Sequence, residues 1–178
     1  MPEKLLAADF QPRPEVITPE TFVPKPKFAA IDAHNHLPAG DARLPLDEIP
    51  RIVRDMDLAG AEAIVNLSGE FGDTLQRRLD ALDRAYPGRF YTFCNVDWEG
   101  VGSAGWADKA TAQMRADVAA GARGLKIYKQ LGLTYRDPAG ALVMPDDPRI
   151  ADVWDAAGGL GIPVLIHSAD PVAFFRPL

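Results

Sequence analysis

The sequence has a single cysteine, Cys94, among its 178 residues, which excludes an internal disulfide framework. It has no apolar run of the length needed to span a bilayer. Its N-terminus lacks a basic region followed by an apolar core and a small-residue cleavage site, so no signal peptide is visible. We therefore expect a cytoplasmic protein with no membrane partner.

Basic residues are outnumbered by acidic ones, 19 to 25, and are scattered along the chain, which carries a net charge of −6. This balance argues against nucleic acid as a partner. The hydrophobic fraction of 47% and the charged fraction of 25% are those of an ordinary globular domain with one core. These values leave a mildly acidic protein whose expected partner is a small-molecule substrate.

The first 27 residues are rich in proline: Pro2, Pro12, Pro14, Pro19, Pro24 and Pro26. Proline fixes φ and lacks an N–H donor, so residues 1–27 are predicted to form an extended strap rather than a helix or a central strand. The strap either packs over the body or contacts another subunit, which would make the protein a homo-oligomer. A loosely held tail is an equal alternative.

From residue 28 onward, apolar strand-like segments alternate with amphipathic helical segments. Strands are predicted at 28–37, 63–68, 90–96, 124–128 and 163–168, and helices at 45–59, 73–86, 104–120 and 148–157. Strict alternation favours parallel strands joined by right-handed crossovers. An open doubly wound sheet and a (β/α)₈ barrel both satisfy this pattern.

The positions of the polar residues favour the barrel. No glycine-rich phosphate loop follows the first strand, whereas polar residues end strands one, four and five. Polar residues that converge from several strand ends are typical of a barrel active site. We therefore predict an α/β fold of the (β/α)₈ TIM-barrel type. A full barrel takes ~250 residues, so residues 28–178 are expected to form an incomplete barrel of about five units.

The first predicted strand ends in a His-x-His pair, His34 and His36. Side chains alternate along a strand, so both imidazoles should project the same way, with Asp32 below them. Two imidazoles on one face can hold a metal ion, and neutral imidazole suits zinc and its neighbours. The pattern also occurs on exposed strands without a metal. Asp32 either orients a ligand histidine or is a buried hydrogen-bonding residue.

The third histidine of the chain, His167, follows the fifth predicted strand. A lone histidine at such a position is typically structural. His167 is predicted to lie at the same edge as the His-x-His pair, and this favours a role as a third metal ligand. Lys126 lies on the fourth strand in phase with Tyr128. If it points into the barrel it must be paired, neutral or modified, because burying an unpaired ammonium is costly. The alternative is an outward-facing lysine.

Three segments in this order, 31–36, 124–128 and 164–171, resemble the amidohydrolase superfamily, in particular its amidohydrolase-related group of metal-dependent hydrolases and non-oxidative decarboxylases. The resemblance implies a distorted (β/α)₈ barrel in which His34, His36 and His167 bind a divalent metal, expected to be zinc. Lys126 matches a lysine that bridges two metals when carboxylated in some branches. In the decarboxylase-like branch it is not a ligand, which leaves Lys126 as a candidate catalytic residue.

The resemblance also implies a histidine on strand six and a ligand and general-base aspartate on strand eight. The sequence ends at Leu178 before either, and Asp170, which follows strand five, does not match that aspartate. We therefore expect the N-terminal portion of a metal-dependent hydrolase that is inactive alone and, when intact, cleaves an amide, ester or lactone bond. The alternatives are a decarboxylase and a degenerate, inactive piece. The loop 129–147 is expected to cover the site, with Arg136 either binding a substrate carboxylate or remaining solvated.

Overall fold

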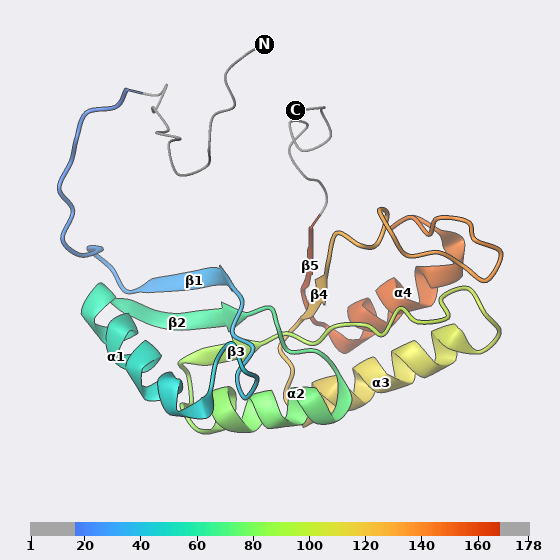
Figure 1. The fold of residues 1–178 in the computed structure, drawn as a ribbon, viewed down its shortest axis with the longest axis horizontal. Coiled ribbons are helices and arrows are strands. Elements are labelled where there is room, and N and C mark those ends of the chain that lie inside the picture. The colour runs from blue at the N-terminus through green and yellow to red at the C-terminus, as the bar shows by residue number, and fades with distance from the viewer. Residues whose placement is uncertain (1–16, 168–178) are drawn as a thin grey trace, which may run out of the picture.

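The computed structural model describes residues 17–167 of the chain (Figure 1). Within this range five strands alternate with four α-helices, in the order β1 (Ala30–Asn35), α1 (Ile49–Ala59), β2 (Ala61–Asn66), α2 (Gly72–Leu79), β3 (Phe90–Thr92), α3 (Trp106–Ala120), β4 (Leu125–Ile127), α4 (Ala151–Leu160) and β5 (Val164–Ile166). The predicted alternation is confirmed. Residues 17–27 form no helix or strand, and Asp170 lies outside the described residues.

All strand pairs are parallel and follow the order of the chain. β1 pairs with β2, β2 with β3, and β4 with β5. The two sheets meet where Cys94, just after β3, forms a parallel bridge to Leu125. There the Cys94 amide donates to Gly124 O at 2.9 Å, and the Lys126 amide donates to Cys94 O at 2.9 Å. The described part of the chain therefore holds an open series of parallel strands and no closed barrel.

The helices begin and end at the residues that favour those positions. α1 follows a short 3₁₀ turn at Leu46–Glu48, has Pro50 in its first turn and ends at Gly60, whose φ of 75° is the left-handed conformation glycine readily adopts. The helix predicted at 73–86 forms in two parts, because α2 ends at Leu79 and continues as a π-helical turn at Asp80–Arg84.

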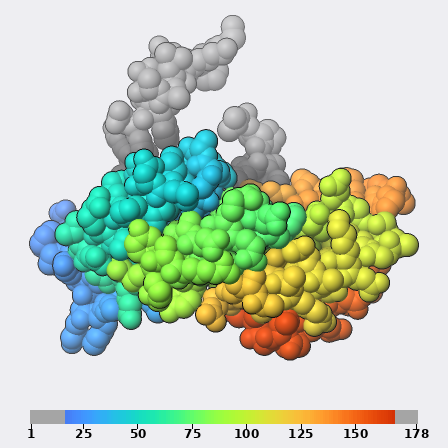
Figure 2. Space-filling model, turned by 90° about the horizontal axis from the view of Figure 1, so that it is seen from below, coloured from blue at the N-terminus to red at the C-terminus, as the bar shows by residue number. Residues whose placement is uncertain are grey.

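The apolar faces of the helices form two cores against the strands. The larger core joins α2, α3, α4 and β4, with Leu79, Met114, Ile127 and Val153 fully buried. The smaller core joins α1 to β2 and β3. Figure 2 shows α1, α2 and α3 as a continuous outer surface, coloured from cyan through green to yellow.

The end strands of the series leave apolar side chains exposed. Ile31 of β1 is 60% exposed, and Val164 and Ile166 of β5 are 40% and 41% exposed. Among residues 17–167, no helix has the length and apolar character needed to cross a bilayer.

Candidate functional site

The His-x-His pair lies where β1 departs from regular geometry. The register with β2 shifts between Asp32 and Asn35. Asp32 stabilises this irregularity by accepting hydrogen bonds from the His34 amide at 3.1 Å and from Asn35 Nδ2 at 2.7 Å. These bonds lower the pKa of Asp32, with the Asn35 side chain as the largest cause. Both hydrogen bonds of Asp32 at this register shift thus come from amide groups, one of the backbone and one of a side chain, and neither comes from an imidazole ring.

The two imidazoles lie together, as predicted. The ring centroids of His34 and His36 are 5.5 Å apart, with the planes at 66°. The His36 ring also makes two contacts that fix its orientation: its Nδ1 lies 3.0 Å from Ser68 Oγ, and it stacks on Tyr128 at a centroid distance of 5.9 Å. With Nδ1 engaged by the hydroxyl, Nε2 is the nitrogen left to bind a metal.

The surroundings of His36 disfavour the charged form of its imidazole. Burial lowers the pKa of His36 most, and the nearby charges of His34 and Lys126 lower it further. Only the neutral ring presents a lone pair to a metal ion. The local electrostatics therefore favour the form of His36 that a metal would require.

Lys126 points inward from β4. It is only 1% exposed, its Nζ lies 5.7 Å from the centroid of the Tyr128 ring, and within the described residues that Nζ has no hydrogen-bond partner. Burial lowers the pKa of Lys126, because desolvation disfavours the ammonium. The alternative of an outward-facing lysine is wrong, and an unsatisfied donor lies beside the imidazole pair.

His167 follows β5, and its backbone amide donates to Ile127 O at 3.0 Å. Between residues 17 and 167 no group of three His, Cys, Asp or Glu side chains is close enough to hold a metal ion. Within the described residues the structure therefore brings together His34 and His36, with Lys126 near them, and does not add His167 to them as a third ligand of one metal ion. The role of His167 as a third ligand stays a prediction.

The sequence pattern does not predict the residues that support His36. Ser68 and Tyr128 contact its ring, and Arg78, 5% exposed, donates to the backbone oxygen of Ser68. Arg78 also pairs with Glu70 at 3.5 Å. One signal was visible in the sequence: Arg78 lies three residues after Leu75 on the apolar stripe of α2, where a charged residue needs buried partners.

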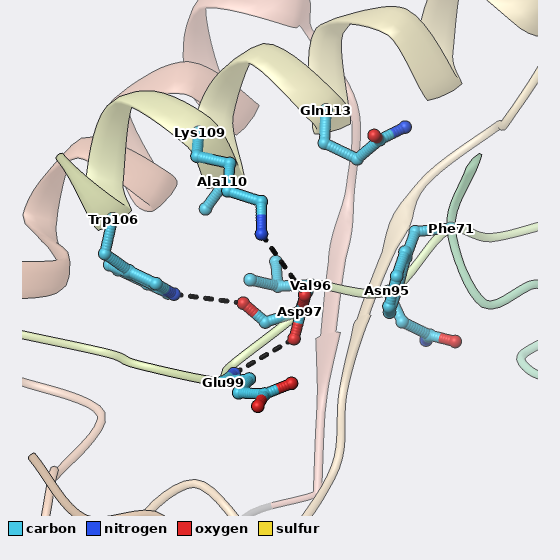
Figure 3. Close-up of a pocket in the computed structure, with 9 residues that line it drawn as sticks. All are labelled: Phe71, Asn95, Val96, Asp97, Glu99, Trp106, Lys109, Ala110 and Gln113. Carbon is cyan, nitrogen blue, oxygen red and sulfur yellow. Dashed lines mark hydrogen bonds and ion pairs between the residues drawn. The ribbon is translucent and has the colours of Figure 1, made fainter.

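Beyond Lys126 and Tyr128 opens a cavity of about 410 Å³ along the end of β3. It adjoins a second cavity of about 170 Å³ under α3, shown in Figure 3. The two share the lining residues Phe71, Asn95, Val96, Asp97 and Glu99. From the loop 129–147, Tyr135 lines the larger cavity, whereas Arg136 is exposed and donates to Gly140 O within its own loop.

Comparisons with known proteins give a family match and likenesses to solved structures. A family model described as amidohydrolase matches residues 31–178. No curated protein matches the chain. A solved structure of a probable 2-pyrone-4,6-dicarboxylic acid hydrolase from Acinetobacter baumannii, with citric acid bound, is similar at 15% identity and a TM-score of 0.47. The likeness covers 79% of this chain and 50% of that one, so this chain spans about half the length of that hydrolase.

Proposed function

Because the chain belongs to the amidohydrolase family, we propose that it forms part of a metal-dependent hydrolase that cleaves an amide, ester or lactone bond of a small molecule. The observation that carries the proposal is the pairing of His34 with His36, whose Nδ1 is engaged by Ser68. Tyr128, on which His36 stacks, lines a cavity of about 410 Å³, which is of the size that takes small molecules.

The two imidazoles can supply two ligands to one divalent transition metal ion. His34 and the Nε2 of His36 would be its ligands, and imidazole nitrogen suits zinc. A bound zinc ion supplies Lewis-acid polarisation of a carbonyl and acidification of a water molecule. Two imidazoles are fewer than the three protein ligands of a catalytic zinc site. We therefore propose that turnover needs further ligands, with His167 as one candidate.

The other residues of the site position the metal ligand and the substrate. Ser68 and Tyr128 fix the His36 ring by a hydrogen bond and by stacking. Lys126 Nζ, buried at the cavity wall without a hydrogen-bond partner in the described residues, can donate to an oxygen of the substrate. A donor at that position would hold the carbonyl or carboxylate that reacts.

A non-oxidative decarboxylase is the second candidate. Lys126 Nζ, which has no hydrogen-bond partner between residues 17 and 167, favours it, because an ammonium can bind a substrate carboxylate directly. The sign of proton exchange separates the two reactions. Hydrolysis of an ester or lactone releases a proton, whereas decarboxylation takes one up and releases CO₂. Hydrolysis of an amide leaves the pH near 7 unchanged, because the amine released takes up the proton of the acid, and it is followed by the amine instead. A metal-loaded chain that neither changes the pH nor releases an amine is the result expected of an inactive piece.

Zinc uptake tests the proposal directly. We expect elemental analysis after equilibrium dialysis to show less bound zinc in His34→Ala and in His36→Ala than in the parent chain. Arg115→Ala, an exposed position on α3, is the control and should bind as much zinc as the parent. Unchanged zinc content in both histidine variants would contradict the proposal. His167→Ala, measured alongside, decides whether His167 is a ligand.

A further inference from the structure

The two adjoining cavities form one crevice that leads away from the histidine pair. We call it the β3 crevice and define it by Glu70, Asp97, Glu99, Trp98 and Lys126. Its floor is the segment just after β3, and α3 closes its far end, with Lys109 and Gln113 projecting from that helix in Figure 3. Because Lys126 lines the crevice and lies beside Tyr128, which stacks on His36, a ligand in the crevice would extend from the proposed metal site.

Charges of both signs line the crevice. Glu70 pairs with buried Arg78 at 3.5 Å, and Asp97 lies 3.9 Å from the exposed Lys109. Asp97 also accepts from the Glu99 amide at 3.0 Å. Carboxylate oxygens therefore offer acceptors along one side of the crevice. At its inner end Lys126 Nζ, without a hydrogen-bond partner in the part of the chain that the structure describes, offers donors.

The walls of the crevice are aromatic and held in place. Trp98 stacks on Trp106 at 5.4 Å and on Tyr135 at 5.9 Å, with planes at 27° in each pair. Trp106 Nε1 donates to Asp97 O at 3.1 Å, so the aromatic wall and the acidic side are tied to each other (Figure 3). Trp98 and Trp106 are only 6% and 5% exposed, so these rings are already ordered before a ligand binds. Aromatic walls fixed in this way favour a flat or ring-shaped ligand at little cost in conformational entropy.

We propose that the β3 crevice binds a neutral, polyhydroxylated ring as the recognition part of the substrate. A hydroxyl group both donates and accepts, so a polyol can satisfy Asp97 and Glu99 as well as Lys126. A polyanion would face the carboxylates, and a cation would face Lys126 and Lys109. This inference rests on the proposed function, because it assigns the substrate class of that same site.

A matched ligand series tests the assignment: D-glucose, D-glucuronate and D-glucosamine at pH 6.5, which share one ring and differ in charge. Binding is followed by tryptophan fluorescence, since Trp98 and Trp106 line the crevice. We expect saturable binding of glucose, with glucuronate and glucosamine each about tenfold weaker, which corresponds to ~1.4 kcal/mol. Tighter binding of either charged sugar, or no saturable signal from any of the three, would overturn the proposal.

Two variants test whether glucose binds in the β3 crevice. Glu99→Gln removes an exposed carboxylate that lines both cavities and should weaken glucose binding while shifting the preference toward glucuronate. Glu62→Gln, an exposed position near the start of β2, is the matched control and should change neither. Equal effects of the two variants would show that glucose binds elsewhere and would overturn the proposal.

The ligand series is measured without metal, so it is independent of the zinc test. If zinc uptake depends on the histidine pair but no sugar binds, this inference fails and the proposed function stands. If glucose binds as expected but zinc uptake is unchanged in both histidine variants, the metal-dependent function fails and the crevice stands as a polyol-binding site.

Discussion

The phenol ring of Tyr128 stacks on the imidazole of His36, with centroids 5.9 Å apart and planes at 26°. The Tyr128 hydroxyl donates to Leu67 O at 2.8 Å. Burial raises the pKa of Tyr128, so the phenol stays protonated and keeps this donor. One side chain from the end of β4 thus holds both the histidine after β1 and the backbone after β2.

Two substitutions at Tyr128 separate these functions. Tyr128→Phe keeps the stack and loses the bond to Leu67 O, so we expect it to lower the free energy of unfolding by about 1 kcal/mol with little change in zinc affinity. Tyr128→Ala removes the ring as well and should also weaken zinc binding. Urea unfolding and zinc titration measure the two effects. Equal zinc affinity in both variants would show that the stack does not position His36.

Ser68 should act on the metal through His36 alone. Ser68→Ala removes the oxygen 3.0 Å from His36 Nδ1, and the loss of such a support to a ligand histidine lowers metal affinity by about tenfold or more. Zinc titration against a competing chelator measures this change. The control is Ser103→Ala, because Ser103 Oγ donates to Gly100 O on an exposed loop far along the chain. Unchanged zinc affinity in Ser68→Ala would show that the Ser68 hydroxyl does not support His36 as a metal ligand.

Local patterns sufficed to predict the order of the elements. Apolar strands with amphipathic helices between them leave few arrangements other than parallel strands in sequence, and pairs β1–β2, β2–β3 and β4–β5 have that arrangement. The period of two along a strand predicted that His34 and His36 lie together, and they do so although His36 follows the last residue of β1. The same period left the direction of Lys126 open, because all three residues of β4 are buried, and its place beside the Tyr128 ring shows that it points inward.

The supports of the site could not be predicted in this way, because they join distant segments. Ser68 meets His36, and the Tyr128 hydroxyl meets Leu67 O, only after the strands are paired. The register shift after Asp32 is also invisible to a regular strand pattern. The Asp32 carboxylate stabilises it by accepting hydrogen bonds from the His34 amide and from Asn35 Nδ2. No periodicity carries information of this kind.

Asp117 gives the chain a pH-dependent stability. Its side chain is 1% exposed, Oδ1 accepts from the Gly72 amide at 3.0 Å and from Gln113 Nε2 at 2.9 Å, and Oδ2 has no partner among the described residues. Burial raises the pKa of Asp117 above 3.8. The folded state therefore binds a proton more readily than the unfolded state, and this contribution to the free energy of unfolding falls as pH rises through the raised pKa.

Asp117→Asn should remove that dependence. The amide oxygen keeps both hydrogen bonds and no charge is buried, so we expect a gain of about 1 kcal/mol in the free energy of unfolding at pH 7 and a smaller difference near pH 4. Urea unfolding at both values measures it. Asp146→Asn, an exposed position, is the control and should give no such pH-dependent difference. A gain that is the same at both pH values would rule out titration of Asp117 as the cause.

Cys94 reports whether the junction between the two sheets opens. It is fully buried, its Sγ lies 3.4 Å from Gly124 O, and burial, with a smaller effect of the Asp117 charge, raises its pKa to about 12. Thiol reagents react with the thiolate, so alkylation of the folded chain at pH 8 should be more than about a hundredfold slower than in urea. Since Cys94 is the only cysteine, labelling followed by mass spectrometry is unambiguous.

Gly124→Ala supplies the matched perturbation, because a Cβ there would meet the Phe93 ring at 2.5 Å. We expect that variant to label faster, as the ring must move away from the bridge that joins β3 to β4. Rapid labelling of the parent chain would mean that the two sheets are not held together at Cys94.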